Sequence, residues 1–267
     1  MTARFNVQWI FAALKNGFRD ATAYQTEFLL EVFGSAFTPA AVQWIMWYAM
    51  FKIGGATEIA GMRYSDMIQY TLVSLLFTQI RGGDQDFELS EMIRTGGLSN
   101  YLLRPVSVIQ FVYVRGIAPK LLLAAICLAL GTGVGVFYGL SPIRLVVGMF
   151  LAILGNIIHY QISAALAAAA FLWEESFALL MVKNMVVSLL SGEMIPLSFF
   201  PSSMEWLWKY SPFYLYVFAP VQISTGKWGW SEMGFHFMIA VFWILFGWAL
   251  IRASWGYGIR KYVSLGS

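Results

Sequence analysis

Histidine, cysteine and acidic side chains carry most enzyme chemistry, and in this sequence they are few and scattered. The chain has two His residues, His159 and His236, and one Cys, Cys127. A metal site needs three or four such ligands close together, and a nucleophile needs a base beside it. The one stretch resembling a phosphate loop, Thr-Gly-Lys at 225–227, lacks the earlier glycine and the following Ser or Thr. We therefore predict no catalytic, metal or cofactor-binding residue, and no ATP hydrolysis by this chain.

Polar side chains within apolar stretches are the next candidates for function. Glu193 lies beside Gly192 and close to Pro196, where a helix should break. A carboxylate at the centre of a bilayer costs about 2.5–3.5 kcal/mol on insertion scales. Glu193 is either a gate or substrate contact, or a structural carboxylate near the outer interface. Asn156 and His159, one helical turn apart, could line the same path or form hydrogen bonds between helices.

The polar loop at 82–115 holds the second group of candidates. Acidic residues open it, Leu89, Met92 and Ile93 form an apolar stripe, and the glycines at 96–97 end it. The pattern predicts a short amphipathic helix. It is either a solvated connector or a docking element for a cytoplasmic partner, because no other loop offers an apolar surface to cover the stripe. The predicted contact residues are Glu88, Glu91, Met92, Ile93 and Arg94.

Composition indicates that the helices that position these side chains cross a membrane. The chain has 267 residues, of which 12% are charged and 59% hydrophobic, whereas soluble domains carry about 25% charged residues. Charge-free stretches at 32–51, 121–143 and 145–173 are each long enough to cross a hydrocarbon layer of about 30 Å as a helix. The fold class is therefore an all-α integral membrane protein, and a disordered chain, a disulfide scaffold and a soluble enzyme are excluded.

Six transmembrane helices are expected. Their approximate ranges are 28–51, 64–81, 116–139, 144–171, 177–199 and 233–252. Lys183, within the fifth, is expected to extend towards the cytoplasmic face near Glu174 or Glu175. Lys and Arg are enriched on the side that holds both termini, Arg81 and the 82–115 loop, so the positive-inside rule places that side in the cytoplasm.

Two further segments are expected to lie at the membrane surfaces. The N-terminal segment, 1–20, has the spacing of an amphipathic interfacial helix. The 197–232 region is rich in Pro and aromatic residues, and it predicts short re-entrant helices that form an outer gate with Glu193, Pro196 and Trp206. The alternative for this region is an external loop with no transport role. We found no internal repeat, so 1–267 is treated as a single membrane domain.

The order of these motifs resembles a known transporter family. The stretches 93–97 (IRTGG) and 102–106 (LLRPV) are similar to the loop between the second and third spans of ABC-2-type permeases. The stretch 191–197 (SGEMIPL), followed by Phe-Pro at 200–201, resembles the signature late in their fifth span. The resemblance covers essentially the whole chain and is nearest to bacterial exporter permeases.

The resemblance implies the membrane subunit of an ATP-driven exporter in the bacterial inner membrane, with both termini cytoplasmic. The implied partners are cytoplasmic ABC ATPase subunits, which hold the ATP and Mg, a second identical or paralogous permease, and membrane lipids. Nucleic acid is not a partner. The helix within 82–115 would be the coupling helix. Lipids, glycolipids, peptides and hydrophobic drugs all fit as substrates.

The alternative function is a stand-alone secondary transporter or channel. That class is typically built from two related halves with paired broken helices, which this sequence lacks. An intramembrane enzyme would need clustered catalytic groups within the spans, and these are absent from the sequence.

Overall fold

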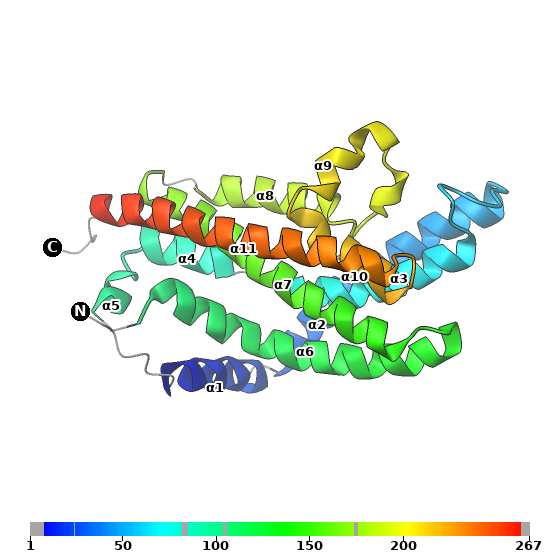
Figure 1. Cartoon of the computed structure of the whole chain (residues 1–267). Coiled ribbons are helices and arrows are strands. Elements are labelled where there is room, and N and C mark those ends of the chain that lie inside the picture. The colour runs from blue at the N-terminus through cyan, green and yellow to red at the C-terminus, as the bar shows by residue number, and fades with distance from the viewer. Residues whose placement is uncertain (1–7, 24, 82–84, 104–105, 174–175, 263–267) are drawn as a thin grey trace.

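The regular structure of this protein is helical throughout the part of the chain that the structure describes. The computed structural model describes residues 8–23, 25–81, 85–103, 106–173 and 176–262 (Figure 1). The α-helices are α1 (Gln8–Ala23), α2 (Gln25–Tyr48), α3 (Tyr64–Arg81), α4 (Gln85–Arg94), α5 (Ser99–Leu102), α6 (Val108–Tyr138), α7 (Pro142–Ala167), α8 (Ser176–Leu190), α9 (Glu205–Lys209), α10 (Phe218–Ser224) and α11 (Trp230–Gly258). A π-helix, η1 (Ala49–Ile53), follows α2, and the 3-10 turns are η2 (Ala168–Phe171), η3 (Leu197–Phe199), η4 (Ser202–Met204), η5 (Phe213–Leu215) and η6 (Ile259–Lys261).

Each predicted span overlaps one helix, although the bounds differ. The six helices are α2, α3, α6, α7, α8 and α11. Among the described residues, three segments are long and apolar enough to cross a membrane, namely Val108–Ile126, Pro142–Phe171 and Trp230–Lys261. The apolar character of the chain is therefore organised into long helices, and the count of six crossings stays a prediction.

The predicted fifth span, 177–199, is too long. Its helix α8 ends at Leu190, and at 15 residues it extends only about 22 Å. The chain then turns at Gly192, whose φ of +77° lies in the left-handed region, and Pro196 precedes the short turn η3. Helix α8 therefore ends well short of the thickness of a bilayer.

Helix α4 does not lie apart from the helical bundle. Figure 1 shows α3 and α4 following one another along the long axis of the molecule, with α5 beyond them at the end where both termini lie. The side chains of α4 pack against α7, η2 and α8. The turn after α4 begins at residues after Thr95, where Gly96 has a φ of +80°.

The segment from η5 to α10 forms the centre of the main hydrophobic core. All seven residues of α10 are buried, and α10 packs on α7 and α3. Two glycines of α7 allow this contact. A Cβ atom added at Gly148 would lie 2.8 Å from the carbonyl oxygen of Pro220, and one at Gly155 would lie 2.7 Å from that of Leu215. Within the predicted 197–232 region, the part from η5 to α10 is thus internal rather than a surface loop.

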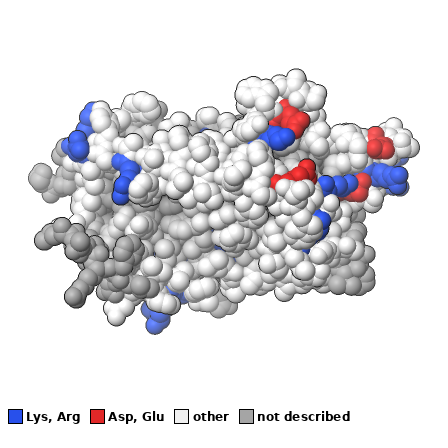
Figure 2. All heavy atoms as spheres, in the orientation of Figure 1, with Lys and Arg blue, Asp and Glu red and all other residues white. Residues whose placement is uncertain are grey.

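Helix α1 packs along α6, as the buried positions Ala13 and Gly17 indicate, since the Gly17 Cα faces the backbone of Arg115. On the face shown in Figure 2, Lys, Arg, Asp and Glu gather towards the two ends of the long axis, and the band between them is uncharged. Such a band is what the hydrocarbon layer of a membrane requires.

Candidate functional site

The end of α8 exposes a piece of irregular backbone to the interior of the bundle. Gly192 is buried, and a Cβ atom there would lie 2.9 Å from both the Phe218 Cβ and the Tyr70 hydroxyl oxygen. Only glycine combines the left-handed φ with so little room. The break in the chain at this point is therefore built into the local sequence.

Three neighbouring helices satisfy the polar backbone of this break. The Tyr70 hydroxyl of α3 donates to the carbonyl oxygen of Gly192 at 2.5 Å. The Gln43 amide of α2 donates to the carbonyl oxygen of Glu193 at 2.8 Å, and the Phe218 amide of α10 donates to that of Ser191 at 2.9 Å. Irregular backbone at membrane depth survives only when it is paired in this way.

The Glu193 carboxylate forms an ion pair with Arg81 of α3. The Arg81 Nη2 atom lies 2.6 Å from the Glu193 Oε2 atom, and the two side chains are only 12% and 15% exposed. The side of the membrane on which Arg81 lies stays a prediction. The chain continues through α4 beyond Arg81, so the guanidinium lies inside the molecule and not at the end of a span.

A cluster of polar groups from α6 and α7 surrounds the same point. Asn156 donates from Nδ2 to the carbonyl oxygen of Ile80 at 2.8 Å and accepts at Oδ1 from the Tyr113 hydroxyl at 3.2 Å. Lys120 of α6 is buried, and its Nζ donates to the Arg81 carbonyl oxygen at 3.4 Å. Asn156 thus forms the interhelical hydrogen bonds that were one of its two interpretations, at the end of α3.

His159 lies one turn further along α7 and faces the core. Its ring is buried and packs edge-on against the ring of Tyr216, with centroids 5.3 Å apart. Neither its Nδ1 atom nor the Tyr216 hydroxyl has a hydrogen-bond partner among the described residues. The two groups therefore leave unused hydrogen-bonding capacity close to the cluster around Arg81.

Lys183 does not extend to the surface as predicted. It is buried, and its Nζ donates to the Ser163 hydroxyl of α7 at 2.8 Å. The acids proposed to receive it, at 174–175, lie outside the described residues. A hydroxyl on the adjacent helix is reached more easily than the membrane surface from the middle of α8.

Pro196 and Trp206, the remaining predicted gate residues, differ in their exposure. Pro196 is buried directly after the break, whereas Trp206 of α9 is 66% exposed. Pro196, Glu193 and Asn156 are therefore all internal, and the structure does not bring Trp206 into the same cluster.

The residues predicted to couple to an ATPase divide into internal and external groups. Glu88 forms an ion pair with Arg115 of α6, and Ile93 is buried. Glu91 and Arg94 form an ion pair of 2.6 Å in which both side chains are more than half exposed. Together with Phe87, Ser90 and Phe177, they line a surface pocket of about 450 Å³.

Leu89, Met92 and Ile93 were expected to dock on a partner because no other loop of this chain could cover them, and this reason is wrong. Leu89 and Ile93 are buried in a hydrophobic cluster with side chains of α6, α7 and α11, and Met92 packs against it. The stripe is covered by the chain's own long helices, which a loop-by-loop inspection of the sequence did not consider. The exposed apolar side chains of this end include Leu102 and Leu103, the latter 88% exposed.

A family model described as "ABC-2 family transporter protein" matches residues 37–266. The chain belongs to the ABC-2 transporter family. It is therefore a multi-pass membrane protein and an ABC-type permease, the membrane subunit of a transporter rather than a catalytic subunit, and its family implies an ABC ATPase partner. Searches of curated proteins and of solved structures found no match.

Two basic residues of this ABC-2 permease were missed as candidates. Arg81 follows only 14 charge-free residues, 67–80, and Lys120 falls inside the predicted third span. A cation that close to a span is itself a signal for an internal polar site. No group of three His, Cys, Asp or Glu residues in the described ranges could hold a metal ion.

Proposed function

We propose that this ABC-2 permease is the membrane subunit of an ATP-driven exporter, working with a separate cytoplasmic ATPase and a second permease. The observation that carries the proposal is the family match over 37–266. The buried Arg81–Glu193 pair at the broken end of α8 supports a gate inside the molecule. Lipids, glycolipids, peptides and hydrophobic drugs are the substrate classes proposed.

In this proposal, Glu193 and Arg81 hold the closed state of the path. Formation of an ion pair with so little exposure costs both charges their hydration, and close geometry with additional hydrogen bonds must offset that cost. Separating the pair would remove one of the links between α3 and the backbone that follows α8, and Gly192 and Pro196 would allow that backbone to move. Asn156 and His159 would line the neighbouring wall.

The surface proposed to meet the ATPase is the exposed surface at the ends of α4 and α5. It comprises Glu91 and Arg94 at the end of α4, and Leu102 and Leu103 at the end of α5. Exposed leucines beside an accessible ion pair combine an apolar contact with charged groups that fix orientation. Both lie at the end of the molecule that holds the termini (Figure 1).

Affinity purification of the full chain from its native membrane tests the partnership. We expect an ATP-hydrolysing subunit to co-purify, and we expect Leu103→Glu to reduce its recovery. Leu207→Glu is the matched control, since Leu207 is 43% exposed in α9, away from the surface at the ends of α4 and α5. Equal recovery with both variants would contradict the docking surface, and absence of any ATPase would favour a stand-alone transporter.

The direction of transport is tested in inside-out vesicles, in which export is measured as uptake. A panel of labelled glycolipid, peptide and hydrophobic dye should include a compound that accumulates only with ATP. Uptake confined to right-side-out vesicles would overturn the exporter assignment.

A further inference from the structure

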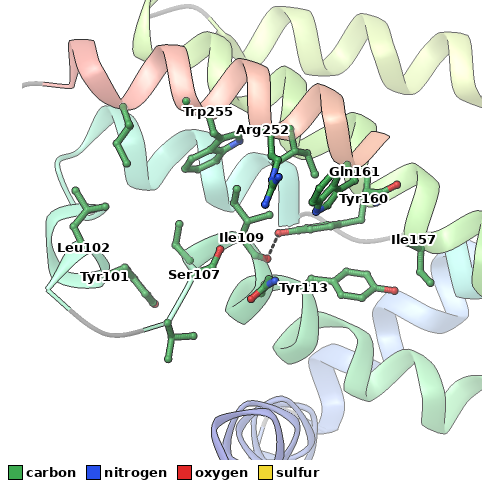
Figure 3. A pocket seen from close by; sticks show the side chains of 17 residues that line it. Tyr101, Leu102, Ser107, Ile109, Tyr113, Ile157, Tyr160, Gln161, Arg252 and Trp255 are labelled. Carbon is green, nitrogen blue, oxygen red and sulfur yellow. Dashed lines mark hydrogen bonds between the residues drawn. The ribbon is translucent and has the colours of Figure 1, made fainter. Parts of the chain in front are cut away.

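A second site lies between α6, α7 and α11, and it borders the cluster around Arg81 only at Tyr113. It is a pocket of about 640 Å³, within the range of about 300–1,000 Å³ that is usual for small-molecule sites. Figure 3 shows Tyr160 and Trp255 on either side of Arg252, whose side chain extends from α11 towards α6. Trp248, also on α11, lines the same pocket.

The walls of this pocket are held in place by hydrogen bonds. The Trp255 indole donates to the Ala164 carbonyl oxygen of α7 at 2.8 Å. The Tyr160 hydroxyl donates to the Ile109 carbonyl oxygen of α6 at 2.6 Å, a bond drawn in Figure 3. Because both aromatic walls are fixed to a neighbouring helix, the pocket is formed before a ligand enters.

The pocket opens to the surroundings through apolar side chains. Leu102, Trp248 and Ile259 line it and are 47%, 52% and 41% exposed. In water such a rim would be unfavourable, whereas it suits a position beside lipid chains.

Among the described residues that line the pocket, Arg252 is the one cation. Its guanidinium carbon lies 3.8 Å above the ring of Trp248. None of the ion pairs within the described part of the chain joins Arg252 to a carboxylate. An apolar pocket with a stacked guanidinium selects a molecule that has an apolar body and an anionic group.

The depth of Arg252 fits the phosphate layer of a bilayer. It lies 22 residues after Trp230, the first residue of α11, which is roughly 33 Å along a helix that rises about 1.5 Å per residue. The hydrocarbon layer is about 30 Å thick. If Trp230 lies at one boundary, Arg252 lies at the other, at the level of the lipid phosphates.

We propose that the α6–α7–α11 pocket binds one anionic glycerophospholipid, with its phosphate at Arg252 and an acyl chain between Trp255, Tyr160 and Trp248. The proposal requires only that α11 crosses the bilayer, and it is independent of the export function and of the ATPase. The lipid is a bound ligand of this face of the molecule, away from the broken end of α8.

Native mass spectrometry of the full chain tests this site. The protein is released from micelles containing equal amounts of dioleoyl phosphatidylglycerol and dioleoyl phosphatidylcholine. We expect one phosphatidylglycerol to be retained in preference to phosphatidylcholine. Arg252→Gln should lower its affinity about tenfold, the size expected for a charge-assisted hydrogen bond. Arg260→Gln, exposed at the same end of the chain in η6, should have no effect.

A second variant tests the pocket by filling it. A Cβ atom at Gly256, which lines the pocket, meets nothing within 4 Å, so Gly256→Phe can place its ring there without a clash. It should abolish retention of both lipids. Gly234→Phe is the matched control, because Gly234 lies on the same helix with equally open space and does not line the pocket.

Three results would overturn the proposal. They are equal retention of the two lipids by the natural sequence, equal retention by Arg252→Gln and Arg260→Gln, and displacement of the lipid by soluble glycerol phosphate, which would indicate a site for a free phosphate. A reporter of the export function, such as ATP hydrolysis, is not needed for any of them.

Discussion

At the scale of single residues, the ion pair between Arg81 and Glu193 is the main charged interaction inside the helical bundle. The two residues are 112 positions apart in the sequence, Arg81 at the end of α3 and Glu193 in the irregular backbone after α8, and each side chain is mostly removed from solvent. Removing one partner of a buried pair costs about 3–5 kcal/mol, because the other charge is left without compensation. Replacing both by apolar side chains is often neutral.

Comparing the single variant with the double variant therefore distinguishes a gate from an ion pair that only stabilises the fold. We expect Glu193→Gln to lower the thermal unfolding midpoint of the purified permease, and the double variant Arg81→Met with Glu193→Met to restore it. If the pair is a gate, the double variant should still show altered ATP hydrolysis when assembled with its ATPase in nanodiscs.

The control is Glu205→Gln, because Glu205 pairs with Lys209 at 3.2 Å on an exposed turn of α9. Surface pairs are worth only about 0–1 kcal/mol, so this variant should leave stability and hydrolysis unchanged. A double Met variant with both normal stability and normal hydrolysis would show that the Arg81–Glu193 pair is only structural.

At the scale of elements, the end of α8 is determined by one glycine. A side chain at Gly192 meets two obstacles, the left-handed φ and the contacts with Phe218 and Tyr70. Gly139, between α6 and α7, has a similar φ of +67° but nothing within 4 Å of its added Cβ.

Gly192→Ala should therefore destabilise the protein more than Gly139→Ala. The backbone strain common to both is about 1–2 kcal/mol, and crowding at Gly192 should add about 1–3 kcal/mol. Thermal unfolding of the two variants in the same detergent measures the difference. Equal losses of stability in the two variants would show that the side chains around Gly192 move aside without a cost in free energy.

Helix α4 gives a second prediction at this scale. In a Cys127→Ser background, Leu103→Cys should react rapidly with a membrane-impermeant maleimide, because Leu103 is 88% exposed. Ile93→Cys should not react in the folded protein, because Ile93 is 5% exposed and packed in the cluster with Leu89. Rapid labelling at position 93 would mean that α4 leaves the bundle, as a free docking helix would.

At the scale of the whole molecule, the distribution of Lys and Arg predicts which end faces which compartment. Cysteines placed at Thr57 and at Ser203, both exposed, should be labelled from outside intact cells. A cysteine at Asn100, also exposed, should be labelled only after the membrane is opened. Labelling of Asn100 from outside would reverse the orientation inferred from the basic residues.

The sequence was most informative where structure depends on neighbouring residues. Apolar runs located the long helices, and Gly192 with Pro196 indicated that the chain breaks after α8. It was least informative about contacts between distant segments. The partner of Glu193, the burial of Leu89 and Ile93, and the pocket around Arg252 each depend on which helices lie side by side, and no local pattern of side chains encodes that arrangement.

The orientation of α8 also has an electrostatic consequence. Aligned peptide dipoles give the carboxyl end of a helix the equivalent of about half a negative charge. That end of α8, at Leu190, lies three residues from the carboxylate that holds Arg81. The carboxylate that pairs with Arg81 therefore follows a helix end that itself carries partial negative charge. Glu193→Gln would therefore remove the full negative charge at this point and leave the partial charge of the helix end.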